Sequence, residues 1–149
     1  MSIEHEACDL MIREVWPACN IEVINTISER EKQRAFGDYV IKEGACVLTV
    51  DVKGETNATG NFPIELIQDV ESMDLGWFYT LRCDEIWYYT KAQGYVWRID
   101  FAKLHKKIGR GKDRWRSTSA TGKYGWTVIL LAPFDDLMDL GISKKWWPA

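Results

Sequence analysis

Three charged residues, Asp38, Asp51 and Lys53, have the side chains needed to hydrolyse a phosphodiester bond. That reaction requires an attacking water, a sink for the charge that develops on the phosphoryl oxygens, and help for the leaving alkoxide. A hard divalent cation serves all three needs, and Mg²⁺ is typically held by one or two carboxylates together with water and substrate phosphate. Asp38 and Asp51 are therefore candidate ligands for Mg²⁺ or Mn²⁺.

The spacing of Asp51 and Lys53 suits this chemistry if both lie on one strand. Residues two apart on a strand point to the same face, about 6.5–7 Å apart along it. Asp51 could then hold the metal while Lys53 reaches the attacking water or the scissile phosphate, and the carbonyl of Val52 is close enough to be another ligand. The ammonium group would also offset part of the repulsion between the two carboxylates.

Two consecutive strands are predicted to position these side chains. Residues 46–53 are apolar on both faces in their early part, which predicts a central strand, and Asp38 begins the short strand before it. Glu43 and Gly44 form the turn between the two strands. An Asp and a Lys at the end of a central strand would lie at the rim of a buried sheet, where ligands collect.

The remaining elements are predicted from apolar spacing and from turn residues. Helices are expected over residues 6–16, 101–108 and 133–140, and strands over residues 21–27, 61–68, 85–90, 95–99 and 126–132. Residues 28–35 indicate a charged turn or helix, residues 76–83 are ambiguous, and residues 109–124 indicate a polar, basic loop. Pro63 is unusual within a strand and argues against pairing there. The order of elements predicts an α/β domain with a central mixed β-sheet flanked by helices.

Asp38, followed by Asp51-Val52-Lys53 on the next strand, resembles the signature of the PD-(D/E)XK nuclease superfamily. The resemblance covers roughly residues 30–104, and these stretches are similar to small nuclease-like proteins often found in phages and mobile elements. The stretches that carry it are Gln33-Arg-Ala-Phe-Gly-Asp38, Val50-Asp-Val-Lys-Gly-Glu55, Thr59-Gly-Asn-Phe-Pro-Ile-Glu65 and Arg82-Cys-Asp-Glu-Ile-Trp87.

This resemblance implies a restriction-endonuclease-like core and a metal-dependent nuclease that acts on DNA. Asp38 and Asp51 would be the metal ligands, and Lys53 would position or activate the water. An acidic residue on the first helix often completes such a site; Glu14 is the first candidate, with Glu6 behind it. Glu65 is a further candidate ligand.

A second feature is a basic segment, since residues 98–123 carry nine lysines and arginines against two aspartates, although the net charge of the chain is −3. Such a segment could contact the phosphate backbone, with one aromatic ring for stacking. A charged loop that only faces solvent would have the same composition. The candidate DNA-binding residues are Lys103, Lys106, Lys107, Arg110, Lys112, Arg114, Trp115 and Arg116.

Several classes of protein are disfavoured by the composition. The longest apolar run is far too short to span a membrane, and the acidic N-terminus does not resemble a secretory signal. The four cysteines show no CxxC pair, and the two histidines are isolated. We therefore expect one soluble domain over residues 1–149, located in the cytoplasm, or in the host cytoplasm if a phage encodes it.

Other functions fit the same residues. The fold could be retained as a non-catalytic module that binds DNA or a protein, or the site could cleave RNA, since nothing in the sequence reads a 2′-hydroxyl. Asp51 and Lys53 could also be a surface salt bridge with no catalytic role. A nuclease this small has little surface for reading a long site, so we expect structure-selective or nonspecific cleavage, and a homodimer could place two such sites on two strands.

Overall fold

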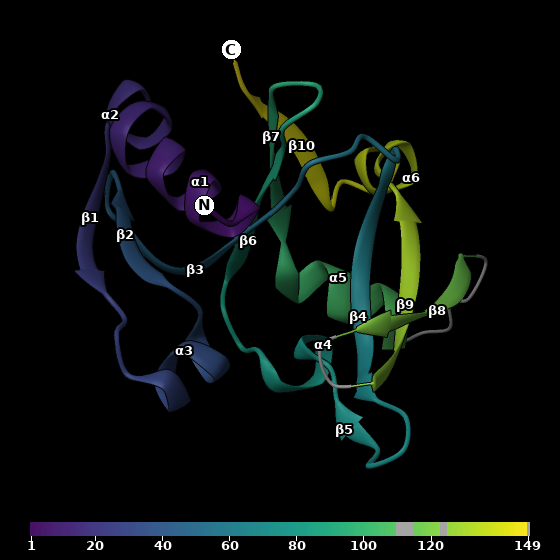
Figure 1. Ribbon diagram of the computed structural model, residues 1–149. Coiled ribbons are helices and arrows are strands. Elements are labelled where there is room, and N and C mark those ends of the chain that lie inside the picture. Colours follow the sequence, from purple (N-terminus) through teal and green to yellow (C-terminus); the bar gives the residue numbers. More distant parts are fainter. Residues whose placement is uncertain (110–114, 123–124, 149) are drawn as a thin grey trace.

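The computed structural model describes residues 1–109, 115–122 and 125–148 (Figure 1). One sheet has six strands, in the order β1 (Ile21–Thr26), β2 (Tyr39–Glu43), β3 (Cys46–Glu55), β6 (Glu85–Thr90), β7 (Tyr95–Asp100) and β10 (Ser143–Trp147). The pairing of β3 with β6 is parallel, and the other pairings in this sheet are antiparallel. The predicted α/β class, with a mixed central sheet flanked by helices, is confirmed.

One face of this sheet is covered by the N-terminal helical segment. It consists of α1 (Ile3–Leu10), the π-helical turn η1 (Met11–Val15) and α2 (Trp16–Ala18). Ser2 caps the segment, since its side chain accepts a hydrogen bond from the His5 amide at 3.1 Å. The apolar side chains of the helices pack against Val50 and Val52 of β3. Gly54 allows the close approach, because a Cβ at this position would lie 3.2 Å from Ile3 Cγ1.

The opposite face of the large sheet packs against a second, four-stranded antiparallel sheet (Figure 1). Its strands are β5 (Asp74–Leu75), β4 (Asn61–Asp69), β9 (Gly125–Pro133) and β8 (Arg116–Gly122). The helices α4 (Trp77–Thr80), α5 (Phe101–Gly109) and α6 (Phe134–Asp139) contribute to the same apolar core. The large sheet therefore has a core on each face, which explains why its central strands are buried on both sides.

The helix α3 (Arg30–Phe36) connects β1 to β2 and ends at Gly37. Gly37 has a φ of 92°, and a Cβ there would lie 2.6 Å from the Val50 carbonyl oxygen. The next residue, Asp38, donates its amide to that same oxygen at 2.9 Å. Only glycine fits both this backbone conformation and this close approach, so Gly37 holds the start of β2 tightly against β3.

Several sequence-based expectations need correction. The basic loop expected over residues 109–124 contains β8, whose residues pair with β9. Pro63 does lie in a paired strand, in register with Leu131 of β9. On the other side of β4, the strand β5 pairs only with residues from Ile67 onward, so no strand lies beside Pro63 there to need a hydrogen bond from its backbone. The strand β10 was not expected at all. No helix in the described part of the chain is long and apolar enough to cross a membrane.

Candidate active site

Asp51 and Lys53 lie on the same face of β3, as their spacing predicts. Lys53 Nζ is 3.0 Å from Asp51 Oδ2, and their side chains are only 19% and 11% exposed. The neighbouring Val50 and Val52 point to the other face, into the core beneath α1. The pair is therefore a largely buried ion pair on a central strand, and the alternative of a solvated surface salt bridge does not fit it.

Asp38 joins this pair from the neighbouring strand. Its Oδ2 accepts a hydrogen bond from the Val52 amide at 2.9 Å, and its carboxyl group is hydrogen-bonded to that of Asp51. Burial, together with the negative charge of Asp51, raises the pKa of Asp38 to about 7, although the Val52 amide and Lys53 act in the opposite direction. Two carboxyl groups thus share one partly buried position next to an ammonium group.

This arrangement fits a hard divalent cation. Burial and the negative charge of Asp51 both raise the pKa of Asp38, and a cation between the two carboxylates would offset both effects. The Val52 amide points to Asp38. The amide and the carbonyl of one strand residue point to the same side of the strand, so the Val52 carbonyl also faces the side on which Asp38 lies. Asp38, Asp51 and the Val52 carbonyl would be the protein ligands, with water and substrate completing the shell.

Few other protein ligands for a metal lie near Asp38 and Asp51 in the described residues. No group of three or more His, Cys, Asp or Glu side chains in the described residues is placed to hold a metal ion. The donor set is therefore two carboxylates and a carbonyl, which is typical of Mg²⁺ sites that rely on water and substrate phosphate rather than on a protein cage.

Lys53 is held as a cation by its neighbours in the metal-free site. Burial alone would lower the pKa of its ammonium group, but the charge and hydrogen bond of Asp51, with smaller contributions from Glu4 and Asp38, outweigh burial and raise the pKa. The ammonium group also lies 4.7 Å from the centre of the Trp77 ring. Lys53 is therefore placed to donate hydrogen bonds and to stabilise negative charge.

The acidic residues predicted on the first helix have other surroundings. Glu14 is exposed on η1 and lines a separate cavity, and Glu6 pairs with Lys91 at 2.9 Å. Glu4, which the sequence analysis did not select, is exposed, and its charge makes a smaller contribution to the raised pKa of Lys53. The helix begins at Ile3 rather than at residue 6. Ser2, a good N-cap residue, was the signal for this earlier start.

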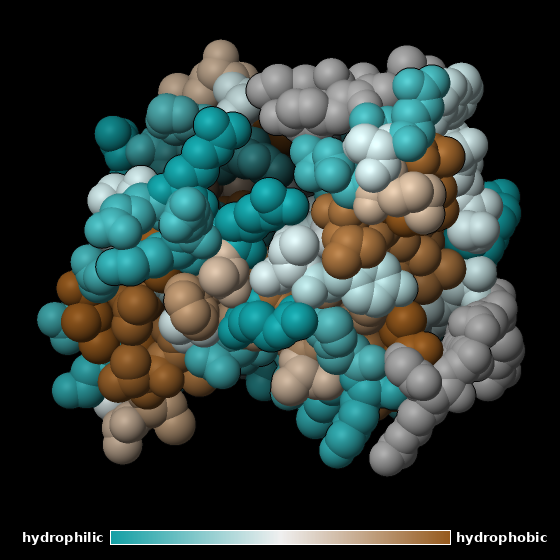
Figure 2. Space-filling view, turned by 90° about the horizontal axis from the view of Figure 1, so that it is seen from below, coloured by the Kyte–Doolittle hydropathy of each residue, from teal (hydrophilic) through white to brown (hydrophobic). Residues whose placement is uncertain are grey.

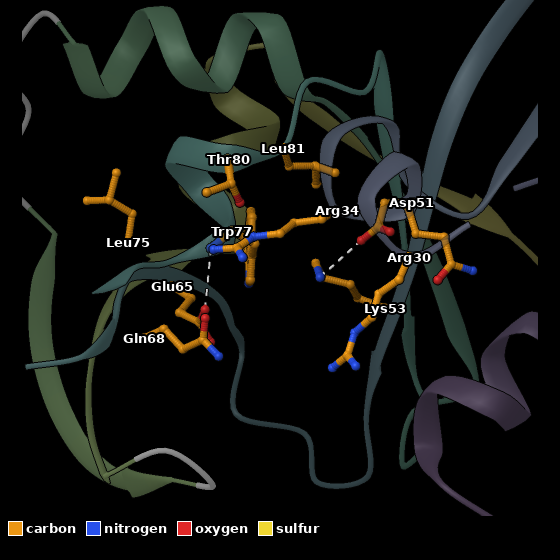
Figure 3. A pocket seen from close by; sticks show the side chains of 11 residues that line it. Arg30, Arg34, Asp51, Lys53, Glu65, Gln68, Leu75, Trp77, Thr80 and Leu81 are labelled. Atoms are coloured by element: carbon orange, nitrogen blue, oxygen red, sulfur yellow. Dashed lines mark hydrogen bonds and ion pairs between the residues drawn. The ribbon is translucent and has the colours of Figure 1, made fainter. Parts of the chain in front are cut away.

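A cavity of about 340 Å³ opens beside Asp51 and Lys53 (Figure 3). Its first wall contains Asp51, Lys53 and three residues of α3, which are Arg30, Gln33 and Arg34. Its second wall comes from β4, β5, α4 and the residue after α4, and consists of Glu65, Gln68, Leu75, Trp77, Thr80 and Leu81. The face of the molecule seen in Figure 2 is hollowed between hydrophilic side chains.

Glu65 does not join the two aspartates. It lies on the second wall, across the cavity from Asp51 (Figure 3), and its Oε1 accepts a hydrogen bond from the Trp77 amide at 3.3 Å. Gly76 allows this contact, because a Cβ there would overlap the backbone of Glu65. The expectation that Glu65 is a metal ligand of the Asp38–Asp51 site is therefore not supported by its position.

The basic segment also lies elsewhere. Lys103 Nζ donates to the Gly141 carbonyl at 3.4 Å, and Trp115 Nε1 donates to Asp136 Oδ2 at 3.0 Å while its ring packs against the core. The cavity is lined by none of the described members of the predicted DNA-binding set, namely Lys103, Lys106, Lys107, Trp115 and Arg116. The other three, Arg110, Lys112 and Arg114, lie outside the described residues.

Besides Lys53, the cationic side chains that line the cavity are Arg30 and Arg34, which the sequence analysis did not select. Their spacing of four residues on a predicted helix, just before Asp38, was the available signal, since such residues share one helical face.

Comparison of the chain with protein-family models, with curated proteins and with solved structures gives no match.

Proposed function

We propose that this protein is a metal-dependent nuclease that hydrolyses phosphodiester bonds in DNA, on a restriction-endonuclease-like core. The observation that carries the proposal is the meeting of Asp38, Asp51 and Lys53, from two adjacent strands, beside a cavity with a cationic wall. The parallel crossover from β3 to β6 and the packing of α1 on β3 support the same core, because they hold the reactive strand rigidly at the centre of the sheet.

The side chains have distinct roles in this proposal. Asp38 and Asp51 hold Mg²⁺ or Mn²⁺, with the Val52 carbonyl as a third protein ligand. A metal held by these residues would supply Lewis-acid chemistry to the phosphoryl group and to the attacking water. Lys53 donates a hydrogen bond to the attacking water or to a phosphoryl oxygen and stabilises the charge that develops there.

Asp51 has two tasks in the same site. In the metal-free protein it forms the ion pair with Lys53, and in the active enzyme it would ligate the metal. Asp38 is held by the Val52 amide, so its carboxyl group is oriented before any metal binds. A pre-oriented ligand loses less conformational freedom on binding, which favours metal affinity at a site with few protein ligands.

The test is cleavage of plasmid, single-stranded and four-way-junction DNA with Mg²⁺, Mn²⁺ or EDTA. We expect cleavage by the wild type that disappears with EDTA and with Lys53→Met. The matched control is Lys91→Met, which removes a lysine from a more exposed ion pair with Glu6 and should cleave normally. A folded wild type that leaves every substrate intact with both metals would contradict the proposal.

A second measurement separates metal binding from catalysis. Titration of Mn²⁺ by isothermal calorimetry should show one binding event per chain for the wild type and a much weaker one for Asp51→Asn. Asp74→Asn, a change to an exposed carboxylate outside the site, is the matched control and should bind normally. Equal affinity in all three proteins would show that Asp51 is not a ligand.

A further inference from the structure

Arg30 and Arg34 are the most distinctive cationic groups near the candidate site. They lie one helical turn apart on α3 and extend toward the cavity (Figure 3). Neither guanidinium group forms an ion pair or hydrogen bond with the part of the chain that the structure describes. Their neighbour Lys32 behaves differently, since it pairs with Glu29 at 3.4 Å and lines another cavity.

Two unpaired guanidinium groups beside Lys53 make the first wall of the cavity a site for an anion. A guanidinium group presents a rigid fork of N–H donors that matches two oxygens of one phosphate group. Asp51 is the acidic residue on this wall, and Lys53 neutralises it. The unbalanced charge on this wall is therefore positive and close to the reacting position.

The second wall has the opposite character. Trp77 and Leu75 present apolar surface, and Leu75 is half exposed. Gln68 and Glu65 add an amide and a carboxylate, of which one Glu65 oxygen is engaged by the Trp77 amide. Apolar surface suits the face of a nucleobase, and amide and carboxylate groups suit its hydrogen-bonding edge. Glu65 would repel a phosphate, so this wall favours the base.

We propose that this cavity takes one unpaired nucleotide of a DNA single strand, with its phosphate against Arg30 and Arg34 and its base against the wall of Leu75 and Gln68. The inference rests on the proposed nuclease function and adds that the DNA is bound as a single strand. The cavity volume of about 340 Å³ is at the small end of ligand pockets and suits one unit of a strand. A paired base would have to leave its duplex first, which costs a few kcal/mol.

The test is binding of a labelled single-stranded oligonucleotide, followed by fluorescence anisotropy in EDTA so that no cleavage occurs. A hairpin duplex of the same composition is the comparison. We expect the single strand to bind roughly tenfold tighter or more, because the duplex must expose a base before it can enter the cavity. Equal affinity for both substrates would overturn the inference.

The phosphate wall is tested with a pair of double variants of equal charge. Arg30→Gln with Arg34→Gln removes both cavity guanidinium groups, whereas Lys32→Gln with Arg13→Gln removes two cations that form ion pairs elsewhere. We expect the arginine variant to bind at least tenfold more weakly and its salt dependence to fall by about 0.7 in log–log slope, the value for one phosphate that is no longer neutralised. Equal losses of affinity in both double variants would overturn the assignment.

The base wall is tested with an altered ligand, so that no folding defect intervenes. A single strand with abasic sites keeps its phosphates but has no base to place against Leu75 and Gln68. We expect weaker binding of this strand by the wild type, since base contacts with protein surfaces contribute about 1–3 kcal/mol each, or roughly fivefold or more. Equal binding of the abasic and normal strands would overturn the role of this wall.

These measurements are independent of the proposed nuclease activity. If the wild type binds single strands through Arg30 and Arg34 but cleaves nothing, the nuclease proposal fails and the nucleotide site stands. If the wild type cleaves DNA and the arginine double variant cleaves and binds as well as the wild type, the nuclease proposal stands and the nucleotide site is wrong.

Discussion

Lys53 Nζ lies 3.0 Å from Asp51 Oδ2, in an ion pair that the two sheets largely bury, and Asp38 adds a second carboxyl group to it. The charge of the Lys53 ammonium group offsets the negative charge of the two carboxyl groups. This dependence has measurable consequences for both stability and activity.

Loss of Lys53 should destabilise the metal-free protein. Lys53→Met leaves two adjacent carboxyl groups without a cation, and breaking a buried pair in this way typically costs about 3–5 kcal/mol. In the double variant Asp51→Asn with Lys53→Met, the uncompensated charge is also removed, so part of that loss should be recovered. The measurement is urea unfolding of the two single variants and the double variant in EDTA. Strictly additive effects would contradict a coupled pair.

Asp38→Asn should stabilise the metal-free protein in a pH-dependent way. The pKa of Asp38 is about 7 in the folded wild type but near 4 in the unfolded chain. The protonated Asp38 therefore contributes fully to the free energy of unfolding below pH 4, and this contribution is lost as the pH rises through 7. The amide variant has no such loss, and its side-chain oxygen can still accept from Val52.

The gain in the free energy of unfolding should therefore grow by roughly 2 kcal/mol between pH 5 and pH 8, since one pKa unit corresponds to about 1.4 kcal/mol. Urea unfolding in EDTA at several pH values checks this. The same variant should lose metal-dependent cleavage, so stability and activity change in opposite directions. A difference in stability that stays constant with pH would contradict the raised pKa of Asp38.

Gly37→Ala should misplace Asp38. The added Cβ would meet the Val50 carbonyl oxygen at 2.6 Å, in a backbone conformation that alanine rarely adopts. We expect a loss of about 3 kcal/mol or more and a loss of cleavage. Gly44→Ala is the matched control, since Gly44 also has a positive φ but nothing lies within 4 Å of a Cβ there. It should cost only about 1 kcal/mol and leave cleavage intact, and equal effects would argue against the close approach.

Arg98→Met should unfold the protein more readily without involving the candidate site. The guanidinium group of Arg98 contacts Glu43 and Glu85 at 2.6–2.9 Å and lies between the rings of Trp87 and Trp146, with centroid distances of 4.9 and 4.6 Å. Removing it leaves two carboxylates without their cation, at a cost of about 3–5 kcal/mol. Thermal unfolding measures this loss. Unchanged Mn²⁺ affinity at a temperature where the variant is folded would separate this cluster from the metal site.

The sequence by itself determined the strand that carries the chemistry. The alternation of side chains along a strand is a local property, so the spacing of Asp51 and Lys53 was enough to place both on one face. The turn predicted at Glu43 and Gly44, which the structure has at Gly44 and Ala45, made the two strands neighbours, and the apolar character of residues 46–53 made the second one central. The proximity of Asp38 to this strand follows from such short-range patterns.

Only the tertiary structure decided which other side chains meet this strand. Glu14 lines a separate cavity rather than the one beside Lys53, and Glu65 lies on the opposite wall because β4 belongs to a second sheet. Clustering of basic residues in the sequence pointed to residues 98–123, but the cavity is lined by the arginines of α3. Contacts between segments far apart in the chain depend on how whole faces pack, and no local spacing reports that packing.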